Sequence, residues 1–486
     1  MRRGSVVLLV AMLAALVGIA PASSSPRAPT VSSTATRAPS GPAAVISGPV
    51  RGGKGIFLLN ARPTNLAAAG YTESEYFASG TAQSYVAAGA LSKTGRWRVK
   101  PKASATYRTR IIVRRPSNPK KFNGTVLVEW LNVSSGIDTA PDFTYMATEL
   151  LRRGYAWVGV TAQLVGVSGG GAVVPVPGIP KGGLRAIDPA RYSSLHHPGD
   201  AYAFDMYTQI GRAVRSPGPA KPLGSLKPLR VLAMGESQSA FELTTYIDAI
   251  QPLAHVYDGF FVHSRGGGAI PLTGGSIANG IVGSIQIRDD IDVPVFLFET
   301  ETDEAFLRYF DARQPDSAHV RLWDVAGASH ADAYIVGAAG SALGCKGEIN
   351  DAPTHYVVAA ALYQLDKWVR TGTPPPSAPR MDVTLINGAP VVQRDALGVA
   401  IGGVRTAAIN VPIAAYSGVP ADATNTLCIL FGSTNPFDAA TLASLYPNQS
   451  AYLTAFTTAT DTAITAGYIL AADRKTILTD AAKITF

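Results

Sequence analysis

Cysteine, charge and metal-binding motifs are scarce in this chain, and each shortage excludes a class of protein. Two cysteines in 486 residues exclude a disulfide-rich scaffold and a zinc site built from four cysteines. Charged residues make up 16% of the chain and hydrophobic residues 47%, which excludes a disordered protein. The sequence also has no H-E-x-x-H motif. We therefore expect a globular protein with a large core and no bound metal.

A glycine-rich stretch early in the chain resembles a phosphate-binding loop but lacks part of its motif. The stretch from Gly48 to Gly55 ends in glycine where Ser or Thr would bind Mg²⁺, and no helical pattern follows it. No G-x-G-x-x-G motif follows the first expected strand. The sequence therefore predicts no nucleotide and no other organic cofactor.

Basic residues exceed acidic ones, 42 against 34, which gives a formal charge of +8. The densest basic stretch, residues 114–121, contains two prolines and no aromatic residue. This composition is typical of a solvated turn rather than of a nucleic-acid surface. We interpret the excess as dispersed surface charge and expect no nucleic-acid partner.

The first residues have the pattern of an export signal. Arg2 and Arg3 precede an apolar run from Val6 to Ala20, which is shorter than the roughly 20 residues of a membrane span. The small-residue site Ala20-Pro21-Ala22 follows, so we expect a signal peptide over 1–22 and a flexible leader over 23–45. An uncleaved anchor helix is the alternative. We expect a secreted protein with no membrane span after cleavage; the export route stays open.

The body of the chain alternates strands and helices. Short apolar runs predict strands that are buried on both faces, and helical patterns lie between them, including a segment that starts at Thr139–Asp142 like a capping box and stops at Gly154. This alternation predicts an α/β fold with a doubly wound, mostly parallel sheet. The expected strands are 107–113, 125–130, 155–160, 230–234, 259–262, 293–298 and 320–325, and the expected helices are 139–154, 199–215, 239–250, 355–370 and 438–446.

Two long loops interrupt this alternation, at 163–198 and 265–291. They are longer than ordinary connections, so we expect them either to border a site or to be plain surface excursions. Three prolines close the last long helical pattern near residue 372. We therefore expect a catalytic domain over 46–372 and a C-terminal extension over 373–486 that packs on it.

The segment Gly235-Glu236-Ser237-Gln238-Ser239 has the context of a nucleophile. An apolar strand pattern precedes it and a helix pattern follows at once, so a tight turn would expose the Ser237 hydroxyl, and the N–H of Gln238 would stabilise an oxyanion. An ordinary turn with a capping serine is the alternative. Gly166-Val167-Ser168-Gly169-Gly170 matches G-x-S-x-G, but prolines follow it, so we expect Ser168 in a loop.

The acid and the base are expected after later strands. The strand that ends near Phe298 is followed by Glu299, Glu301 and Asp303; Asp303 is the expected acid and Glu301 the alternative. His330 follows the last strand and is the expected base, so that the chain order is Ser, Asp, His. Two other histidines compete: His355 opens a helix, and His263 ends another strand, where it could line the pocket.

A second oxyanion donor is expected in the loop 131–136, after the strand 125–130. We favour the backbone near Asn132 and Val133. The alternative is that Asn132 is only a turn-forming residue.

These pieces together resemble the α/β-hydrolase superfamily, and within it a bacterial group described simply as α/β-hydrolase domain proteins. The resemblance implies the fold and a Ser-His-acid mechanism, but little about the substrate. The sequence departs from G-x-S-x-G at Ser239. The similar segments are Val128-Glu129-Trp130-Leu131-Asn132, Gly235–Ser239, Glu301-Thr302-Asp303, Trp323-Asp324-Val325-Ala326-Gly327 with His330, and Gly402-Gly403-Val404-Arg405.

We expect a secreted serine hydrolase of carboxylic esters that uses Ser237, His330 and Asp303. Its substrate is a small-molecule or polymeric ester, and the oligomeric state stays open. A peptidase or thioesterase on the same fold, or a non-catalytic binding protein, are the alternatives. We also expect an exported protein to oxidise Cys345 and Cys428 to a disulfide; two unpaired buried thiols are the alternative.

Overall fold

The computed structural model describes residues 41–59, 64–172, 181–275, 277, 280–337, 344–421 and 427–485. The expected signal peptide over 1–22 and most of the expected leader over 23–45 lie outside the described residues. The end of the leader is ordered: Val45 opens a strand, and the N–H of Ala44 donates to the carbonyl of Gln209 at 2.9 Å.

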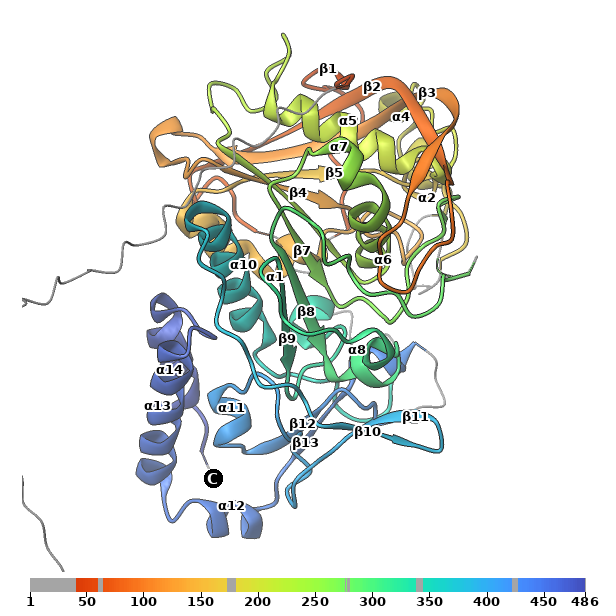
Figure 1. Cartoon of the computed structure of the whole chain (residues 1–486). Helices are drawn as coiled ribbons and strands as arrows, with labels where there is room; N and C mark the ends of the chain where they lie inside the picture. The colour runs from red at the N-terminus through yellow and green to blue at the C-terminus, as the bar shows by residue number, and fades with distance from the viewer. Residues whose placement is uncertain are drawn as a thin grey trace, which may run out of the picture. The chain divides into compact units, whose positions relative to one another are not determined.

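Among the described residues, a nine-stranded sheet runs in the order β1-β2-β3-β5-β4-β6-β7-β8-β9 (Figure 1). From β5 through β4 to β9 the neighbouring strands are parallel, whereas β1, β2, β3 and β5 pair antiparallel. The prediction of an α/β fold with a mostly parallel sheet is confirmed, and all the expected strands are present. The strands are β1 Val45–Ser47, β2 Tyr71–Ala87, β3 Val99–Pro116, β4 Thr125–Trp130, β5 Ala156–Val160, β6 Arg230–Glu236, β7 Gly259–His263, β8 Val295–Thr300 and β9 Val320–Val325.

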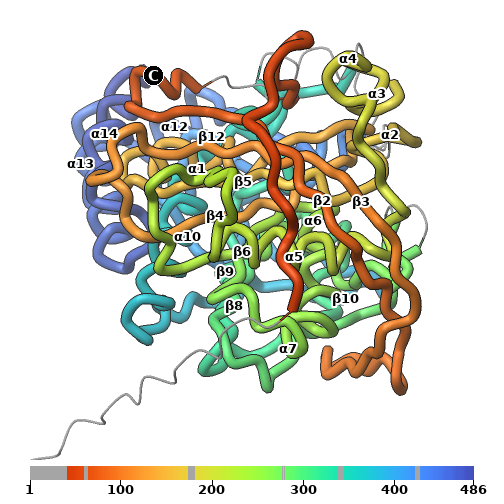
Figure 2. The backbone as a smooth tube through the Cα atoms, turned by 90° about the horizontal axis from the view of Figure 1, so that it is seen from above, coloured from red at the N-terminus to blue at the C-terminus, as the bar shows by residue number. Residues whose placement is uncertain are grey.

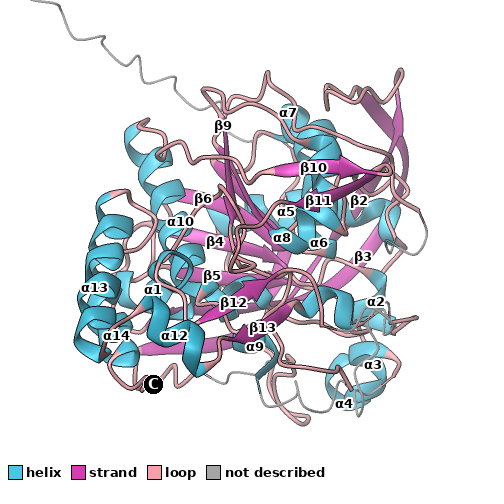
Figure 3. Ribbon diagram, turned by 90° about the horizontal axis from the view of Figure 1, so that it is seen from below, coloured by secondary structure: helices cyan, strands magenta, loops and turns pink. Residues whose placement is uncertain are grey.

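Strands β4 to β9 of this sheet are buried on both faces, as their continuous apolar runs predict. Along β6, Val231 and Ala233 belong to one core cluster, and Leu232 and Met234 belong to the other, because successive side chains of a strand point to opposite faces. Helices α5 (Ala203–Arg215) and α6 (Gln238–Thr245) contribute to the first cluster, and α1 (Pro141–Arg153) and α10 (Thr354–Thr371) contribute to the second. Figure 3 shows the two groups of helices on opposite sides of the sheet. The sheet is therefore doubly wound.

The helices agree with the expected segments, with one correction at α1. Pro141 opens α1 and Gly154 ends it in the left-handed conformation, but Thr139 does not cap it; Glu129 accepts the N–H groups of Asp142 and Phe143 instead. The helices are α1 Pro141–Arg153, α2 Leu164–Ser168, α3 Gly183–Ile187, α4 Pro189–Tyr192, α5 Ala203–Arg215, α6 Gln238–Thr245, α7 Gln251–Ala254, α8 Glu301–Ala305, α9 Ala333–Val336, α10 Thr354–Thr371, α11 Ala407–Asn410, α12 Ala439–Leu445, α13 Gln449–Thr465 and α14 Arg474–Ala481, with a π-helical turn Tyr246–Ile250 between α6 and α7 and short 3₁₀ turns at Pro119–Lys121, Asp200–Tyr202, Tyr309–Ala312, Cys428–Phe431 and Ala471–Asp473.

The hairpin of β2 and β3 is longer than the sequence suggests. Its two strands pair antiparallel from Tyr71 opposite Pro116 to Ala87 opposite Val99, and in Figure 2 they run alongside each other. We expected only residues 107–113 of it, because β2 is rich in Ala, Ser, Gly and Glu, which have low strand propensity.

The C-terminal part packs on the sheet through backbone and side-chain contacts. Val404 extends the edge beside β9: its N–H donates to Asp324 O at 2.6 Å, and its carbonyl accepts from Ala326 N–H at 3.0 Å. Arg152 of α1 pairs with Asp473 at 2.7 Å. Figure 1 shows α13 and α14 beside each other in this part. It also contains two small antiparallel pairs, β10 Val383–Ile386 with β11 Ala389–Val392, and β12 Ala414–Ser417 with β13 Ser433–Pro436.

The expected disulfide is present: Cys345 and Cys428 are bonded, with their Cα atoms 5.6 Å apart. The bond ties the segment before α10 to the C-terminal part. Within the described ranges, no helix combines the length and apolar character that a membrane crossing requires.

Candidate active site

Ser237 stands on a tight turn between β6 and α6. Its φ of 57° and ψ of −122° are unusual for a residue with a side chain, a conformation that costs about 1–3 kcal/mol and persists only where its surroundings impose it. The turn is tight because the residues around it are small: a Cβ atom on Gly235 would lie 3.0 Å from the Cβ of Ser239. Ser239 is fully buried, so it fills the place of the usual glycine without widening the turn.

Three predicted residues meet at the carboxyl ends of the parallel strands. The Oγ of Ser237 lies 2.7 Å from Nε2 of His330, and Nδ1 of His330 lies 2.6 Å from Oδ1 of Asp303. These residues follow β6, β9 and β8, which lie within the run of four consecutive parallel strands β6-β7-β8-β9. The order of these residues in the chain, and their positions after strands, predicted that the three side chains would lie in contact.

The carboxylate of Asp303 is held by the start of α8. Its Oδ2 accepts the N–H of Thr300 at 2.8 Å and the hydroxyl of Thr300 at 2.7 Å, which is a capping box. Sequence reasoning missed Thr300, although the spacing Thr300-x-x-Asp303 is the signal that would have identified it. The capping box leaves Oδ1 free to face His330.

His330 is buried, and two opposing effects act on its pKa. Burial lowers the pKa of the imidazole, but the charge of Asp303 and its hydrogen bond raise it, and the net effect is a raised pKa. An imidazole with this environment can take a proton from Ser237 and hold it.

The alternative acid and the alternative base make contacts elsewhere. The carboxylate of Glu301, the alternative acid, accepts the N–H of Gly327 at 2.6 Å and pairs with Arg394 at 2.5 Å. The ring of His355 stacks on Tyr334, with ring centroids 4.0 Å apart. Of the two carboxylates considered, the structure brings only Asp303 to His330.

His263 also lies near the triad but faces a different partner. Its Nδ1 lies 2.8 Å from Oδ1 of Asp142, and both side chains are buried. Burial lowers the pKa of His263 to about 4, so the ring is neutral near pH 7. The backbone carbonyl of His263 accepts the N–H of Ser237 at 2.9 Å. His263 is therefore one of the buried residues that surround Ser237.

The two expected oxyanion donors differ in whether their backbone N–H groups are already hydrogen-bonded. Gln238 is the first residue of α6, a position whose N–H has no acceptor within the helix. The N–H of Asn132, by contrast, donates to the carbonyl of Thr139 at 3.0 Å, so Asn132 has no spare backbone donor. The N–H of Val133, the other residue expected in that loop, donates to no described residue.

The side chain of Asn132 has a role that the sequence did not indicate. Its Nδ2 donates to the carbonyl of Glu236 at 3.0 Å and to Oε2 of Glu236 at 3.2 Å. Glu236 is buried beside His330, with Oε1 3.7 Å from Nε2. Burial raises the pKa of Glu236 to about 7, against the opposing effect of a charged His330.

Ser168 was expected in a loop, and this expectation is wrong: it is the last residue of helix α2. The helix precedes Ser168 instead of following it, and Gly169 ends the helix. A nucleophile turn needs the reverse order, strand, serine, then helix, so Ser168 still lacks the required geometry.

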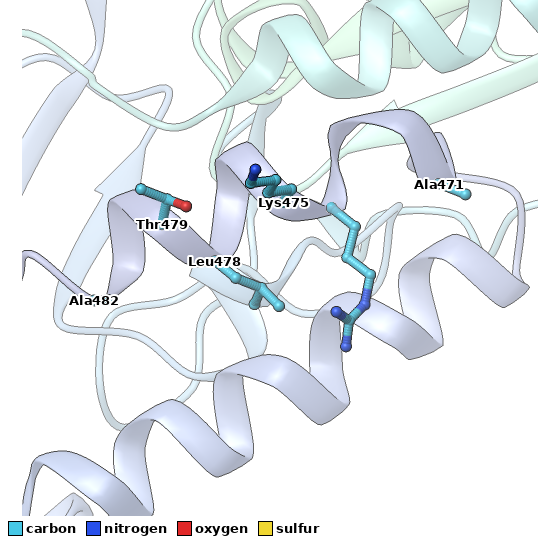
Figure 4. A pocket seen from close by; sticks show the side chains of 6 residues that line it. Ala471, Lys475, Leu478, Thr479 and Ala482 are labelled. Atoms are coloured by element: carbon cyan, nitrogen blue, oxygen red, sulfur yellow. The ribbon is translucent and has the colours of Figure 1, made fainter.

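Two hollows elsewhere are lined by none of Ser237, Asp303 and His330. Figure 4 shows one at α14, lined by Ala471, Arg474, Lys475, Leu478, Thr479 and Ala482. The other, of about 220 Å³, lies between α10 and the C-terminal helices and is lined partly by Tyr334, His355 and Phe456. Within the described part of the chain, no three His, Cys, Asp or Glu side chains are grouped as metal ligands would be.

The profile of one protein family, described as "Alpha/beta hydrolase domain", matches residues 46–479 of the chain. No curated protein matches the sequence. Solved structures with some similarity include a fungal esterase from Rhizomucor miehei (10% identity, TM-score 0.30, covering 61% of this chain and 85% of that one).

Two bacterial structures are similar at a comparable level. One is an α/β serine hydrolase without a lid from Xanthomonas campestris (11% identity, TM-score 0.28, 51% of this chain and 87% of that one). The other is a glucuronoyl esterase from Solibacter usitatus (11% identity, TM-score 0.26, 59% and 84%). These likenesses are too distant to bear on the activity of this chain.

Proposed function

Because the chain belongs to the alpha/beta hydrolase domain family, we propose that it is a serine hydrolase that cleaves carboxylic esters through an acyl-enzyme. One observation carries this proposal: Ser237 Oγ, both nitrogens of His330 and the carboxylate of Asp303 form one continuous chain of short contacts. The strained turn at Ser237 supports it, because such strain persists where function requires it. An ester is a less demanding substrate than an amide, because an alkoxide leaves the tetrahedral intermediate more readily than an amine anion does.

The proposed reaction begins with attack by Ser237. As Oγ bonds to the ester carbonyl carbon, its proton passes to Nε2 of His330, and the carbonyl oxygen becomes an oxyanion. The C–O bond to the leaving group then breaks, and the Nε2 proton passes to the departing alkoxide. Water, deprotonated by His330, releases the acid from the acyl-enzyme, and Ser237 recovers its proton. Asp303 fixes the ring and stabilises its cation throughout.

Two backbone donors would hold the oxyanion. The N–H of Gln238 lies at the positive end of α6, next to the nucleophile. We assign the second donor to Val133 rather than Asn132, because the N–H of Asn132 is already bonded to Thr139.

We also propose that the protein is exported by the signal peptide over 1–22 and belongs to the bacterial group that the sequence resembles. The disulfide between Cys345 and Cys428 fits an oxidising compartment. The same proposal treats 46–372 as the catalytic domain and 373–486 as an extension that packs on it. The substrate would be a small or polymeric ester.

A labelling experiment tests the nucleophile without knowledge of the substrate. A fluorophosphonate should modify the folded protein at one site, and peptide mapping should locate the label on Ser237. Labelling elsewhere, or none, would contradict the proposal. A panel of p-nitrophenyl esters, amides and thioesters then distinguishes an esterase from a peptidase or a thioesterase.

A further inference from the structure

His330 has a second carboxylate beside it, on the opposite side of the ring from Asp303. Glu236 is the last residue of β6 and directly precedes Ser237. Its Oε1 lies 3.7 Å from Nε2 of His330, the same nitrogen that contacts Ser237 Oγ at 2.7 Å. Each ring nitrogen therefore has its own carboxylate nearby.

The position of Glu236 is fixed by its surroundings. Its side chain is 6% exposed, and Asn132 Nδ2 donates to Oε2 at 3.2 Å. Asn132 is itself held, because its Oδ1 accepts the N–H of Ser134 at 2.8 Å. The carboxylate is therefore oriented by one donor on Oε2, which directs Oε1 toward the imidazole.

We propose that Glu236 is a second carboxylate partner of His330, a positioning residue that stabilises the imidazolium from its Nε2 side while Asp303 does so at Nδ1. This inference rests on the proposed function, in which His330 becomes a cation as Ser237 attacks. Glu236 exchanges no proton in this step: the proton of Ser237 moves to Nε2, and the carboxylate lowers the energy of the charge that results.

Few other charges face Glu236. His263, on the neighbouring strand β7, is neutral because burial lowers its pKa to about 4. Burial raises the pKa values of Asp142 and Tyr145 on α1, which favours their uncharged forms. The remaining charged groups are His330 and Asp303. The Glu236 carboxylate therefore acts mainly on His330, and its influence grows as it ionises above a pKa of about 7.

The experiment compares the full-length protein with Glu236→Gln, which keeps the size and the acceptor for Asn132 but removes the charge. The pKa of His330 is read by NMR of histidine-labelled protein, with His330→Gln used to assign the signal among seven histidines. Glu129→Gln is the matched control. Glu129 is a buried carboxylate on β4, and in the described chain it binds α1 and Trp157 but not His330.

In Glu236→Gln the pKa of His330 should fall by about one, since an opposite charge at this distance raises such a pKa by roughly that amount or more. The acid limb of the pH profile of kcat/KM should move to lower pH together with the His330 pKa. The plateau value of kcat/KM should fall about tenfold, the factor that corresponds to one pKa unit. Glu236→Asp keeps the charge but holds it farther from Nε2, so it should lower the His330 pKa by a smaller amount, and Glu129→Gln should leave this pKa unchanged.

An unchanged His330 pKa in folded Glu236→Gln would overturn the inference, as would an equal fall in Glu129→Gln. If Glu236→Gln does not fold, Glu236→Asp decides: a lower His330 pKa than wild type supports the contact, and an identical one contradicts it. The NMR result does not depend on ester hydrolysis. A wild-type protein without hydrolase activity would therefore refute the proposed function and leave the Glu236–His330 contact to its own test.

Discussion

The two carboxylates that follow β8 bind different partners and so have different roles. Asp303 faces Nδ1 of His330 at 2.6 Å, whereas Glu301 binds Gly327 and Arg394. Under the proposed mechanism a carboxylate at Nδ1 fixes the tautomer of the base. The carboxylate of Glu301 instead joins α8 to the C-terminal part, so its contribution is to stability.

Amide substitutions separate these roles. Asp303→Asn should lower kcat by roughly 10³–10⁴-fold, because an amide at this position favours the wrong tautomer of His330. Glu301→Gln should lower kcat by less than tenfold and show its effect in the free energy of unfolding. Steady-state kinetics with a p-nitrophenyl ester and urea unfolding measure the two effects. Mild and equal losses of kcat would remove Asp303 from the mechanism.

Sequence reasoning could predict the contact of Ser237, Asp303 and His330 because each follows an apolar strand in a fixed chain order. It could not assign Asn132, because a loop position does not reveal whether its N–H is free or bonded across the loop to Thr139. The approach of Glu236 to His330 was equally hidden, since it depends on a side-chain orientation that Asn132 sets.

At the scale of elements, the short helix α8 links the sheet to the site. Its capping residue Thr300 binds Asp303 through both its N–H and its hydroxyl. The helix start and the orientation of the carboxylate therefore depend on the same side chain.

Thr300→Val should remove the hydroxyl contacts and keep the backbone donor. We expect a loss of about 1 kcal/mol in the free energy of unfolding, typical of a lost N-cap, together with a lower kcat because Asp303 is less firmly held. Thr458→Ala, on α13, removes a hydroxyl that bonds only within its own helix, so it serves as the control. Wild-type kcat in Thr300→Val would show that the capping box does not orient Asp303.

Strands β4 to β9 were predictable because they are apolar on both faces and carry β-branched residues. The Ala- and Ser-rich strand β2 was not, because its pairing with β3 overrides its weak local preference. Helix α13 was missed for a similar reason: its buried residues Tyr452, Phe456, Thr460 and Ala463 lie on one face, but threonine and alanine surround them and obscure the pattern.

At the scale of the whole molecule, residues far apart in sequence are joined beside the site. The disulfide closes 83 residues of chain between Cys345 and Cys428, and Arg394 reaches Glu301 from the C-terminal part. The two cysteines were predicted to pair from the expected export alone, because pairing requires no knowledge of the fold when only two thiols are present.

Replacing both cysteines by serine should destabilise the folded protein by roughly 4–5 kcal/mol, the loop-closure entropy of a loop of this length less any strain. Urea unfolding of the variant and of the wild type measures the difference, and adding reductant should affect only the wild type. Equal stabilities would show that the bond contributes nothing to the fold.

The most direct test of the account is ester hydrolysis by Ser237→Ala beside Ser168→Ala. Ser168 is exposed at the end of α2 and stands in the segment 166–170 that matches G-x-S-x-G in full, so it is the matched control. Ser237→Ala should keep the wild-type circular dichroism spectrum and lose several orders of magnitude in kcat, since only oxyanion binding and substrate binding remain. Ser168→Ala should hydrolyse esters at the wild-type rate. Full activity in Ser237→Ala, or an inactive Ser168→Ala, would contradict the assignment of the nucleophile.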